Sequence, residues 1–354
     1  MSNSGFVSII IPCRNEEKFI GKCLDSIITQ DYPKDKMEVF VVDGMSEDKT
    51  RDILKTYSTK YPFITLLDNP KKIIPTAMNI GIKNAKGEII MKCDAHSESP
   101  KDYISKCVKY LEEFGADNVG AMCNYIPRKS TVMGKAIVAS LCHSFGVGNS
   151  YSRIGVKEPI FSDTAYGGCY KREVFERIGL YDENIARSED ITINSKLRKA
   201  GGKILLVPEI KIHYYTRSNF FEFCKHNFDN GLWAIIPFKY TDIIPVSLRH
   251  FVPLAFVLSL VGVGILSFFS SIFVWLFLLI VGSYFLANIY FSTKIVLKEK
   301  DLKFLVIMSI IFTSLHLSYG LGSVWGLIKV SVSKRFWKNL KHILVDKSND
   351  KASI

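Results

Sequence analysis

Between Phe251 and Phe291 the chain contains no Asp, Glu, Lys or Arg, and a second uncharged run extends from Phe304 to Ile328. A helix needs about 20 apolar residues to cross a bilayer, so the first run is long enough for two spans and the second for one. The alternative is a fully buried helical hairpin in a soluble domain. The length of the runs favours a transmembrane region of about three helices at residues 251–328.

The positive charge of the chain lies largely beside these runs. The formal net charge is +12. The basic residues next to the runs are Lys294, Lys298, Lys300, Lys303, Lys329, Lys334, Arg335, Lys338 and Lys341. Basic segments beside spans favour the cytoplasmic side of a membrane and anionic lipid head groups. We therefore attribute the charge to membrane orientation and expect no nucleic-acid partner.

The expected location is the cell inner (plasma) membrane, as a multi-pass protein with its amino-terminal domain in the cytoplasm. The first residues have no signal-peptide pattern, and the eight cysteines, without a CxxC pair, indicate free thiols in a reducing compartment. Three full spans would place the basic tail, residues 329–354, outside the cell, against the positive-inside tendency. Either residues 304–328 bend back as a re-entrant pair, or the charge rule fails here.

Residues 1–216 alternate strand and helix patterns, with strands expected at 7–11, 37–42, 63–67 and 88–93 and helices at 16–28, 52–57 and 76–85. Such alternation predicts an α/β domain with a mainly parallel sheet and helices on both faces. We expect a helix at 126–141, a loop at 146–159 and two short strands at 203–207 and 210–215. Residues 217–250 suit interfacial amphipathic helices, with an ordinary packed helix pair as the alternative.

The stretch GEIIMKCDAH, residues 87–96, reads as a buried parallel strand that leads into Asp94 and His96. Ligands bind at the carboxyl ends of strands in an open α/β sheet. The i, i+2 spacing puts the two side chains on one side of an extended chain, so both could reach one divalent cation. A turn-forming aspartate and a surface histidine are the alternative.

Three aspartates follow strands or begin a helix: Asp43, Asp94 and Asp190. Carboxylates gathered at one sheet edge repel each other unless a cation or donor groups compensate. Neither GxGxxG nor GxxxxGK[ST] occurs, so a dinucleotide enzyme and a P-loop kinase are not supported. The pattern suggests a metal-assisted reaction on a phosphate-bearing ligand.

Four ordered motifs carry a resemblance to a known family. VSIIIPCRNEE at 7–17, VVDGMSEDKT at 41–50, KCDAHSESP at 92–100 and the block from Gly167 to Gly202 resemble inverting glycosyltransferases of family 2 with the GT-A fold. Bacterial exopolysaccharide enzymes of the succinoglycan glucosyltransferase type are most similar in appearance. The resemblance covers about residues 6–215 and implies a Rossmann-like nucleotide-sugar-binding domain.

The resemblance also implies roles for individual residues. Asp190 would be the general base, with Glu189, Gly167 and Gly168 on the acceptor side, although a helix cap and a tight turn are structural alternatives for these positions. Asp94 and His96 would bind Mn²⁺ or Mg²⁺, with Mn²⁺ better suited to imidazole. Asp43 would accept a hydrogen bond from a uracil imino group. The donor side would comprise Pro12, Arg14, Glu16, Asp43, Gly44 and Asp94.

The expected activity is transfer of a sugar from a nucleotide-sugar to a polyprenyl-diphosphate-linked saccharide at a membrane, with a UDP-sugar as the expected donor. The segment HNFDNGLW lacks the QxxRW signature of processive members, so we expect one sugar to be added per encounter. Two alternatives stay open: a polyprenyl-phosphate sugar transferase, and a non-catalytic scaffold subunit that binds nucleotide-sugar.

Overall fold

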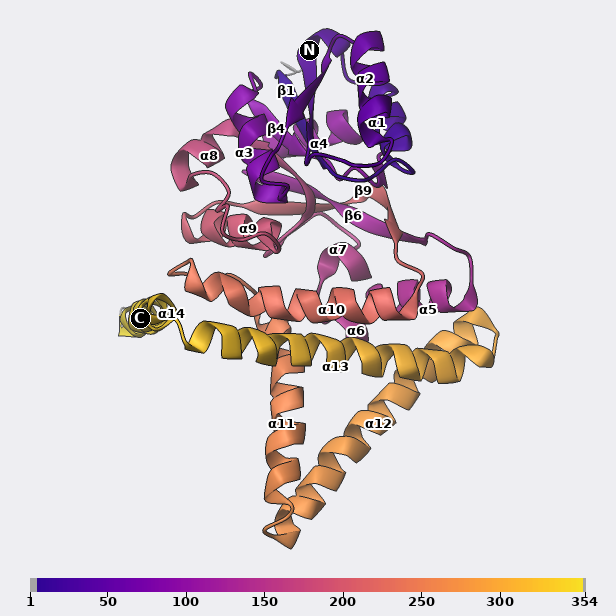
Figure 1. Cartoon of the computed structure of the whole chain (residues 1–354), viewed down its shortest axis with the longest axis vertical. Coiled ribbons are helices and arrows are strands. Elements are labelled where there is room, and N and C mark those ends of the chain that lie inside the picture. The colour runs from indigo at the N-terminus through magenta and orange to yellow at the C-terminus, as the bar shows by residue number, and fades with distance from the viewer. Residues whose placement is uncertain (1–4, 353–354) are drawn as a thin grey trace. The chain divides into compact units, whose positions relative to one another are not determined.

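The computed structural model describes residues 5–352. The chain divides into two compact units. The first contains the residues up to 124 together with 151–215, and the second contains 125–150 together with the chain from 216 onward. Segment 125–150, which we had expected in the amino-terminal domain, thus belongs with the carboxyl-terminal helices (Figure 1).

The first unit is built on a nine-stranded sheet in the order β3-β2-β1-β4-β8-β6-β9-β5, with β7 paired to β9. Its first four strands are parallel: β1 (Val7–Cys13), β2 (Met37–Asp43), β3 (Ile64–Asp68) and β4 (Ile89–Lys92). The α/β fold predicted from the alternating pattern is confirmed. Because these strands are covered on both faces, they carry the expected near-continuous apolar runs.

The strands beyond β4 are β5 (Ser97–Glu98), β6 (Asn118–Pro127), β7 (Ile160–Phe161), β8 (Tyr166–Lys171) and β9 (Ile204–Thr216). β8 pairs antiparallel with β4 and β6, and β9 pairs antiparallel with β5 and β7. One long β9 replaces the two short strands expected around Pro208. The strand keeps its partners on both sides of the proline, with β7 at Leu205 and Leu206 and with β5 further along. A proline removes one donor from a ladder without preventing pairing elsewhere.

Helices pack on both faces of this sheet: α1 (Ile20–Ile28), α2 (Thr50–Lys60), α3 (Ile74–Asn84), α4 (Tyr103–Glu113), α7 (Tyr151–Ile154), α8 (Arg172–Ile178) and α9 (Glu189–Lys199), with a 3₁₀ turn at Lys34–Lys36. Along β1, Val7, Ile9 and Ile11 enter the core shared with α1 and α4, whereas Ile10 enters the core shared with α3 and α9. This alternation is the period of two that a strand imposes. Packing in these two cores holds the carboxyl ends of the parallel strands in place, and the site lies at these ends.

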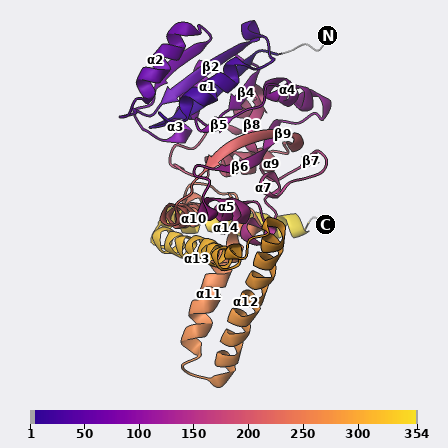
Figure 2. The ribbon, with the colours of Figure 1, turned by 90° about the vertical axis from the view of Figure 1, so that its right-hand side faces the viewer.

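The second unit is helical: α5 (Val132–Leu141), α6 (Ser144–Val147), α10 (Phe220–Ile235), α11 (Val252–Leu266), α12 (Ser271–Glu299), α13 (Lys303–Ser331) and α14 (Lys334–Ala352), with 3₁₀ turns at Ile236–Lys239 and Leu248–Phe251. The helix expected at 126–141 begins only at Val132, because β6 continues to Pro127 and Thr131 caps α5 through the Gly134 amide. Three segments are long and apolar enough to cross a membrane: Leu248–Leu266, Ser271–Glu299 and Lys303–Ser331. Figure 2 shows α11 and α12 as a hairpin that projects from the rest of this unit.

Candidate functional site

A pocket of about 160 Å³ opens at the carboxyl ends of the parallel strands. Its lining includes all of the donor-side residues predicted from the sequence except Asp43, together with the predicted ligand His96: Pro12, Arg14, Glu16, Gly44, Asp94 and His96. Val42, Ile73, Ile74 and Ala77 form an apolar wall, and Lys72 adds a second cation beside Arg14. The pocket therefore offers apolar surface for a flat ring and positive charge for a phosphate.

Asp43 lies behind this pocket, fully buried at the end of β2. Arg51 donates to its Oδ2 at 2.6 Å, and the Ser46 hydroxyl donates to its Oδ1 at 2.5 Å. The neighbouring Gly44 lines the pocket instead. The carboxylate thus orders the loop after β2, and its predicted contact with a uracil would require that this loop opens.

Asn69 lines the same pocket and was not singled out from the sequence. Its side chain is buried, and Nδ2 donates to the Ile73 carbonyl at 2.9 Å. Within residues 5–352, Oδ1 is buried without a hydrogen-bond partner. A buried acceptor without a donor carries a desolvation cost, so it marks a place where a ligand N–H could bind. An Asn that follows a strand is indistinguishable from an ordinary turn residue, so no local pattern marks this position.

The two predicted metal ligands stand on the rim of this pocket with separate supports. Tyr166 donates to Oδ2 of Asp94 at 2.8 Å, and Nδ1 of His96 lies 3.0 Å from Oε1 of Glu16. An ionised carboxylate only accepts hydrogen bonds, so Glu16 fixes the proton on Nδ1 and leaves the Nε2 lone pair available. Such a carboxylate partner is typical of metal-binding histidines.

The residues present therefore fit a divalent cation that takes its remaining ligands from a substrate. Within the described chain, no group of three or more His, Cys, Asp or Glu side chains is placed to hold an ion alone. Burial opposes ionisation of Asp94, but the charge of Lys92 and the Tyr166 hydrogen bond outweigh burial, and the pKa of Asp94 lies below its usual value. An anionic oxygen is thus kept ready at this position. Glu16 both lines the pocket and contacts His96, and its contact with a donor stays a prediction.

A buried lysine joins the other half of the predicted site. Lys92, the last residue of β4, is 3% exposed; its Nζ lies 2.9 Å from Oε1 of Glu189 and 2.5 Å from Oδ2 of Asp190. Lys92 and Asp94 are two residues apart on an extended chain, so their side chains leave it on the same side. The predicted base is therefore tied to the strand that presents the predicted metal ligand.

The environment of Asp190 brings the pKa of its carboxyl group close to neutral pH. Burial raises the pKa of Asp190 to about 7, the Lys92 charge opposes this shift, and Glu189 adds to it. Oδ2 faces Lys92, whereas Oδ1 is buried with no hydrogen-bond partner among the described residues. A carboxylate that titrates near neutral pH suits a general base, because proton transfer is most effective when the pKa lies near the working pH.

The start of α9 differs from the helix cap expected at Ser188–Asp190. Ser188 has φ +61° and its side chain caps no backbone amide, whereas Thr192 donates to its carbonyl. A non-glycine residue in the left-handed region costs about 1 kcal/mol or more, so the surrounding structure holds it there. This backbone turn directs Glu189 and Asp190 toward β4.

The glycine pair at the start of β8 has a conformational explanation. Gly167 and Gly168 both have positive φ, and a Cβ on Gly168 would lie 2.4 Å from the Tyr170 ring. Gly168 is buried and Gly167 only partly exposed. Contact of either residue with an acceptor stays a prediction.

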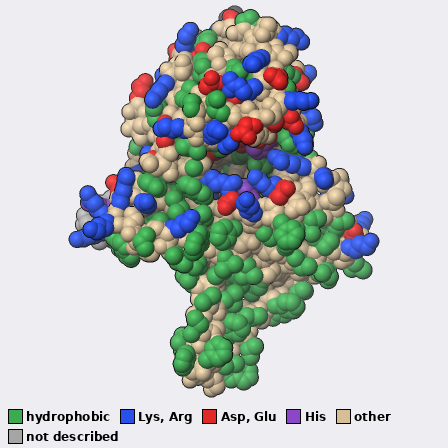
Figure 3. Space-filling model, in the orientation of Figure 1, with side chains coloured by type: hydrophobic (Ala, Val, Ile, Leu, Met, Phe, Trp, Pro, Cys, Tyr) green, Lys and Arg blue, Asp and Glu red, His purple; other side chains and the backbone are tan. Residues whose placement is uncertain are grey.

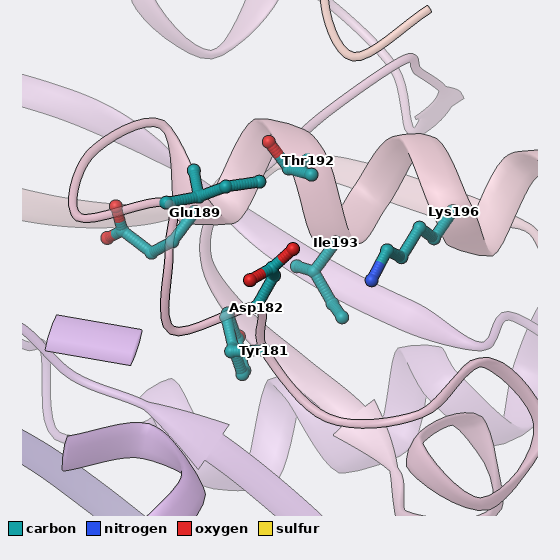
Figure 4. Close-up of a pocket in the computed structure, with 7 residues that line it drawn as sticks. Tyr181, Asp182, Glu189, Thr192, Ile193 and Lys196 are labelled. Atoms are coloured by element: carbon teal, nitrogen blue, oxygen red, sulfur yellow. The ribbon is translucent and has the colours of Figure 1, made fainter. Parts of the chain in front are cut away.

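A second, much smaller cavity of about 10 Å³ lies beside α9, lined by Tyr181, Asp182, Ile185, Glu189, Thr192, Ile193 and Lys196 (Figure 4). A cavity of this size holds no more than one water molecule. It is therefore not a sugar site.

The comparisons with known proteins agree with this geometry. A family model described as glycosyl transferase family 2 matches residues 8–179. A dolichyl N-acetyl-α-D-glucosaminyl phosphate 3-β-D-2,3-diacetamido-2,3-dideoxy-β-D-glucuronosyltransferase from Methanococcus voltae is 33% identical over 234 residues, which cover 64% of this chain and 72% of that protein. A succinoglycan biosynthesis protein from Rhizobium meliloti is 28% identical over 249 residues, covering 70% of this chain and 74% of the relative.

Among solved structures, a mannosyltransferase from Pyrobaculum calidifontis, in complex with GDP-mannose and Mn²⁺, has a TM-score of 0.61 at 19% identity. The similarity covers 92% of this chain and 88% of that one. At this identity the likeness establishes the fold.

Proposed function

The chain belongs to glycosyl transferase family 2, and we propose that it is an inverting, metal-dependent enzyme that moves a sugar from a nucleotide-sugar to a lipid-linked saccharide. The observation that carries the proposal is the contact of Lys92 with Asp190, since it joins a candidate base to the strand that ends at Asp94. Asp190 does not line the pocket itself, but Lys92 links it to the strand that leads into the pocket. The Asp94 side would then serve the leaving group, and the Asp190 side the attacking hydroxyl.

The pocket supports binding of the nucleotide half of the donor. Its apolar wall suits a base, and Asn69 Oδ1 is an acceptor for an N–H at the base edge, a role that we had expected for Asp43. Arg14 and Lys72 also line the pocket, and their charges suit a diphosphate. Uracil presents one imino N–H, so a UDP-sugar is the proposed donor class.

Asp94 and His96 would hold the divalent cation, with His96 oriented by Glu16. When bound, a divalent cation neutralises the charge that develops on a departing diphosphate. Tyr166 fixes the orientation of the Asp94 carboxylate through the hydrogen bond to Oδ2. An imidazole ligand favours Mn²⁺ over Mg²⁺.

Asp190 would accept the proton of the acceptor hydroxyl as that oxygen attacks the anomeric carbon. The new bond forms between the acceptor oxygen and this carbon, the bond to the diphosphate oxygen breaks, and its electron pair leaves with the nucleoside diphosphate. Lys92 holds one carboxylate oxygen of Asp190, so the other can receive the proton. Attack from the face opposite the leaving group inverts the anomeric carbon.

The acceptor proposal draws on the relatives and on the apolar helices. One relative is named for a dolichyl phosphate-linked sugar acceptor and another for succinoglycan biosynthesis. Three segments of this chain are long and apolar enough to cross a membrane, which suggests membrane association. A polyprenyl-linked saccharide presents its hydroxyl at a bilayer surface, where such an enzyme would meet it.

A donor screen tests this proposal directly. Purified full-length protein is incubated with UDP- and GDP-sugars, with and without Mn²⁺, in vesicles that contain polyprenyl-diphosphate-linked saccharide, and nucleotide release is measured. We expect one UDP-sugar to react, with dependence on both cation and acceptor. Lack of turnover with every donor would contradict the proposal. Release of the new sugar by mild acid as a free monosaccharide, instead of as part of the acceptor saccharide, would identify a polyprenyl-phosphate sugar transferase.

A further inference from the structure

The apolar helix α13 packs along α10, with the two backbones in contact. A Cβ built on Gly322 would lie 1.9 Å from the carbonyl oxygen of Phe228, and one on Gly231 would lie 1.9 Å from that of Tyr319. Ser323 also donates to the Gly231 carbonyl at 3.1 Å. Figure 1 shows α10 and α13 side by side over much of their length. The two helices are therefore held at the same depth relative to a bilayer.

The sequence of α10 excludes it from the hydrocarbon core. Glu222 and Lys225 are exposed on this helix, and Asp229 lies one turn further on. Each ionised side chain at the centre of a bilayer costs about 2.5–3.5 kcal/mol on insertion scales. A helix packed this closely against α10 cannot cross the membrane without drawing these charges into it. The composition of α13 would allow a span, but its partner does not.

The hairpin of α11 and α12 meets α13 only at its base. A Cβ on Gly320 would approach the Pro253 carbonyl and Val257 in the first turns of α11, and Asn288 in the second half of α12 donates to the Ser309 carbonyl and to Thr313. The buried residues of α11 are Leu254 and Val257, and those of α12 are Asn288, Ser292, Ile295 and Val296. Tyr284 Oη lies 2.9 Å from Nδ1 of His316 in α13, so residues 258–283 extend beyond α13. Figure 3 shows hydrophobic side chains covering this projection.

The length of the hairpin, measured from its base, matches the thickness of a bilayer. The 19 residues of Leu248–Leu266 give a helix of about 28 Å at 1.5 Å per residue. The hydrocarbon core is about 30 Å thick. The exposed tip contains Phe268, Phe269 and Ser270, whereas Lys294, Lys298 and Lys303 lie toward the base. Lysines at the base and none at the tip indicate which end faces the head groups of the cytoplasmic leaflet.

We propose that only α11 and α12 cross the bilayer, and that α13 lies at the membrane surface beside α10. Exposed apolar side chains of α13, among them Val306, Ile310, Leu321 and Ile328, would then contact the acyl chains near the head groups. An even number of crossings returns α14 to the side of the amino-terminal unit, so its lysines obey the positive-inside tendency. This inference concerns attachment and holds whether or not sugar transfer occurs.

Single-cysteine labelling of the full chain in cells tests the proposal. The background replaces Cys142 and Cys224, the two partly exposed thiols, by serine. Cysteines are then introduced singly as Lys109→Cys in the amino-terminal unit, Ser270→Cys at the tip and Lys338→Cys in α14, all at exposed positions. A membrane-impermeant maleimide is applied to intact cells, with the outer envelope opened where one is present, and after lysis. Phe269→Cys is the second tip variant in case Ser270→Cys does not accumulate.

We expect the Ser270→Cys variant to label in intact cells, and the Lys109→Cys and Lys338→Cys variants to label only after lysis. Labelling of Lys338→Cys from outside, with Lys109→Cys protected, would show that α13 crosses and would overturn the proposal. Protection of the tip as well would show that the hairpin does not cross. Recovery of the protein in the soluble fraction would show that it is not attached to the membrane. Either result would overturn the proposal. The background variant must remain unlabelled in intact cells. None of these readouts depends on turnover, so a failed donor screen and a failed topology are separate results.

Discussion

The ammonium nitrogen of Lys92 lies 2.5 Å from Oδ2 of Asp190, although 98 positions separate the two residues in the chain. The contact links the end of β4 to the start of α9, and Glu189 completes it from the same helix turn. Lys92 is thus a positioning residue for the proposed base. The pH dependence of the rate can distinguish this positioning role of Lys92 from a purely structural one.

Replacing Lys92 by Met should shift the acidic limb of the rate profile to higher pH. In the unmodified enzyme kcat/KM should rise with pH through about 7, because burial raises the pKa of Asp190 to that value and the base must lose its proton to act. The charge of Lys92 lowers the pKa of Asp190, so removal of this charge should raise the pKa further and move the limb to higher pH. The measurement is kcat/KM against pH. Lys92→Arg should restore the profile in part. Lys196→Met, a substitution on α9 beyond Asp190, should leave the profile unchanged. An unshifted limb in Lys92→Met would contradict the assigned role.

Asp190→Asn should abolish transfer while leaving donor binding intact. A positioned base contributes about 10²- to 10⁴-fold to rate, so turnover should fall by that factor. Calorimetric titration with the donor and cation reports binding, and nucleotide release reports turnover. If donor affinity falls in parallel with turnover in a folded variant, Asp190 belongs to the donor site and not to the acceptor side.

Glu16→Gln should weaken activation by Mn²⁺ because the amide no longer holds the His96 ring as a charged partner does. Partners of metal ligands typically contribute 10- to 100-fold in metal affinity. The measurement is the Mn²⁺ concentration that gives half-maximal nucleotide release. Glu17→Gln is the matched control, since Glu17 accepts from the Lys49 amide instead. Equal effects of the two substitutions would argue against His96 as a ligand.

Asn69→Ala should raise the KM for the donor with little change in kcat. Loss of one neutral hydrogen bond is worth about 1 kcal/mol, or roughly fivefold. Asn84→Ala at the exposed end of α3 provides the control, because its side chain bonds only within its own helix. A variant that binds UDP as tightly as the parent would show that Asn69 does not contact the base.

Gly322→Val should destabilise the helical unit, because a Cβ at this position would meet the Phe228 carbonyl of α10. Overpacking of a close contact costs typically 1–3 kcal/mol, so the thermal midpoint in detergent should fall. Gly282→Val in α12 is the control, since a Cβ there meets nothing within 4 Å. Equal midpoints for both variants would show that the close approach of α10 and α13 is absent from the protein in detergent.

The parallel half of the fold and many residues that line the pocket could be predicted from the sequence, because both follow from local patterns. Apolar strand runs end at Asp43 and Asp94, and chain direction alone brings such ends to one sheet edge. Lys92 escaped prediction, although a lysine inside the apolar run of GEIIMKC was a usable signal for a buried ion pair. Burying such a charge is costly unless it is partnered, so its position implied an acidic partner elsewhere.

Other features could not be predicted because they depend on tertiary contacts. Tyr166 bonds to Asp94 across 72 positions, and no local pattern marks it. The burial of Asp43 by Arg51 depends on how the loop after β2 folds back. Composition described α13 as a span equal to α12, since hydropathy does not record that Gly322 and Gly231 bring it against a charged helix.

The uncharged tip of the hairpin bears on how this protein is assembled. Phe268, Phe269 and Ser270 separate α11 from α12, and the sequence from Phe251 to Phe291 contains no ionisable acid or base other than Tyr284 and Tyr290. Insertion of the two helices together would therefore carry no formal charge through hydrocarbon, and the main barrier to translocation of a loop would be missing. Most of the chain, including every strand of the sheet, is synthesised before the hairpin, and the hairpin could then partition into lipid as one piece.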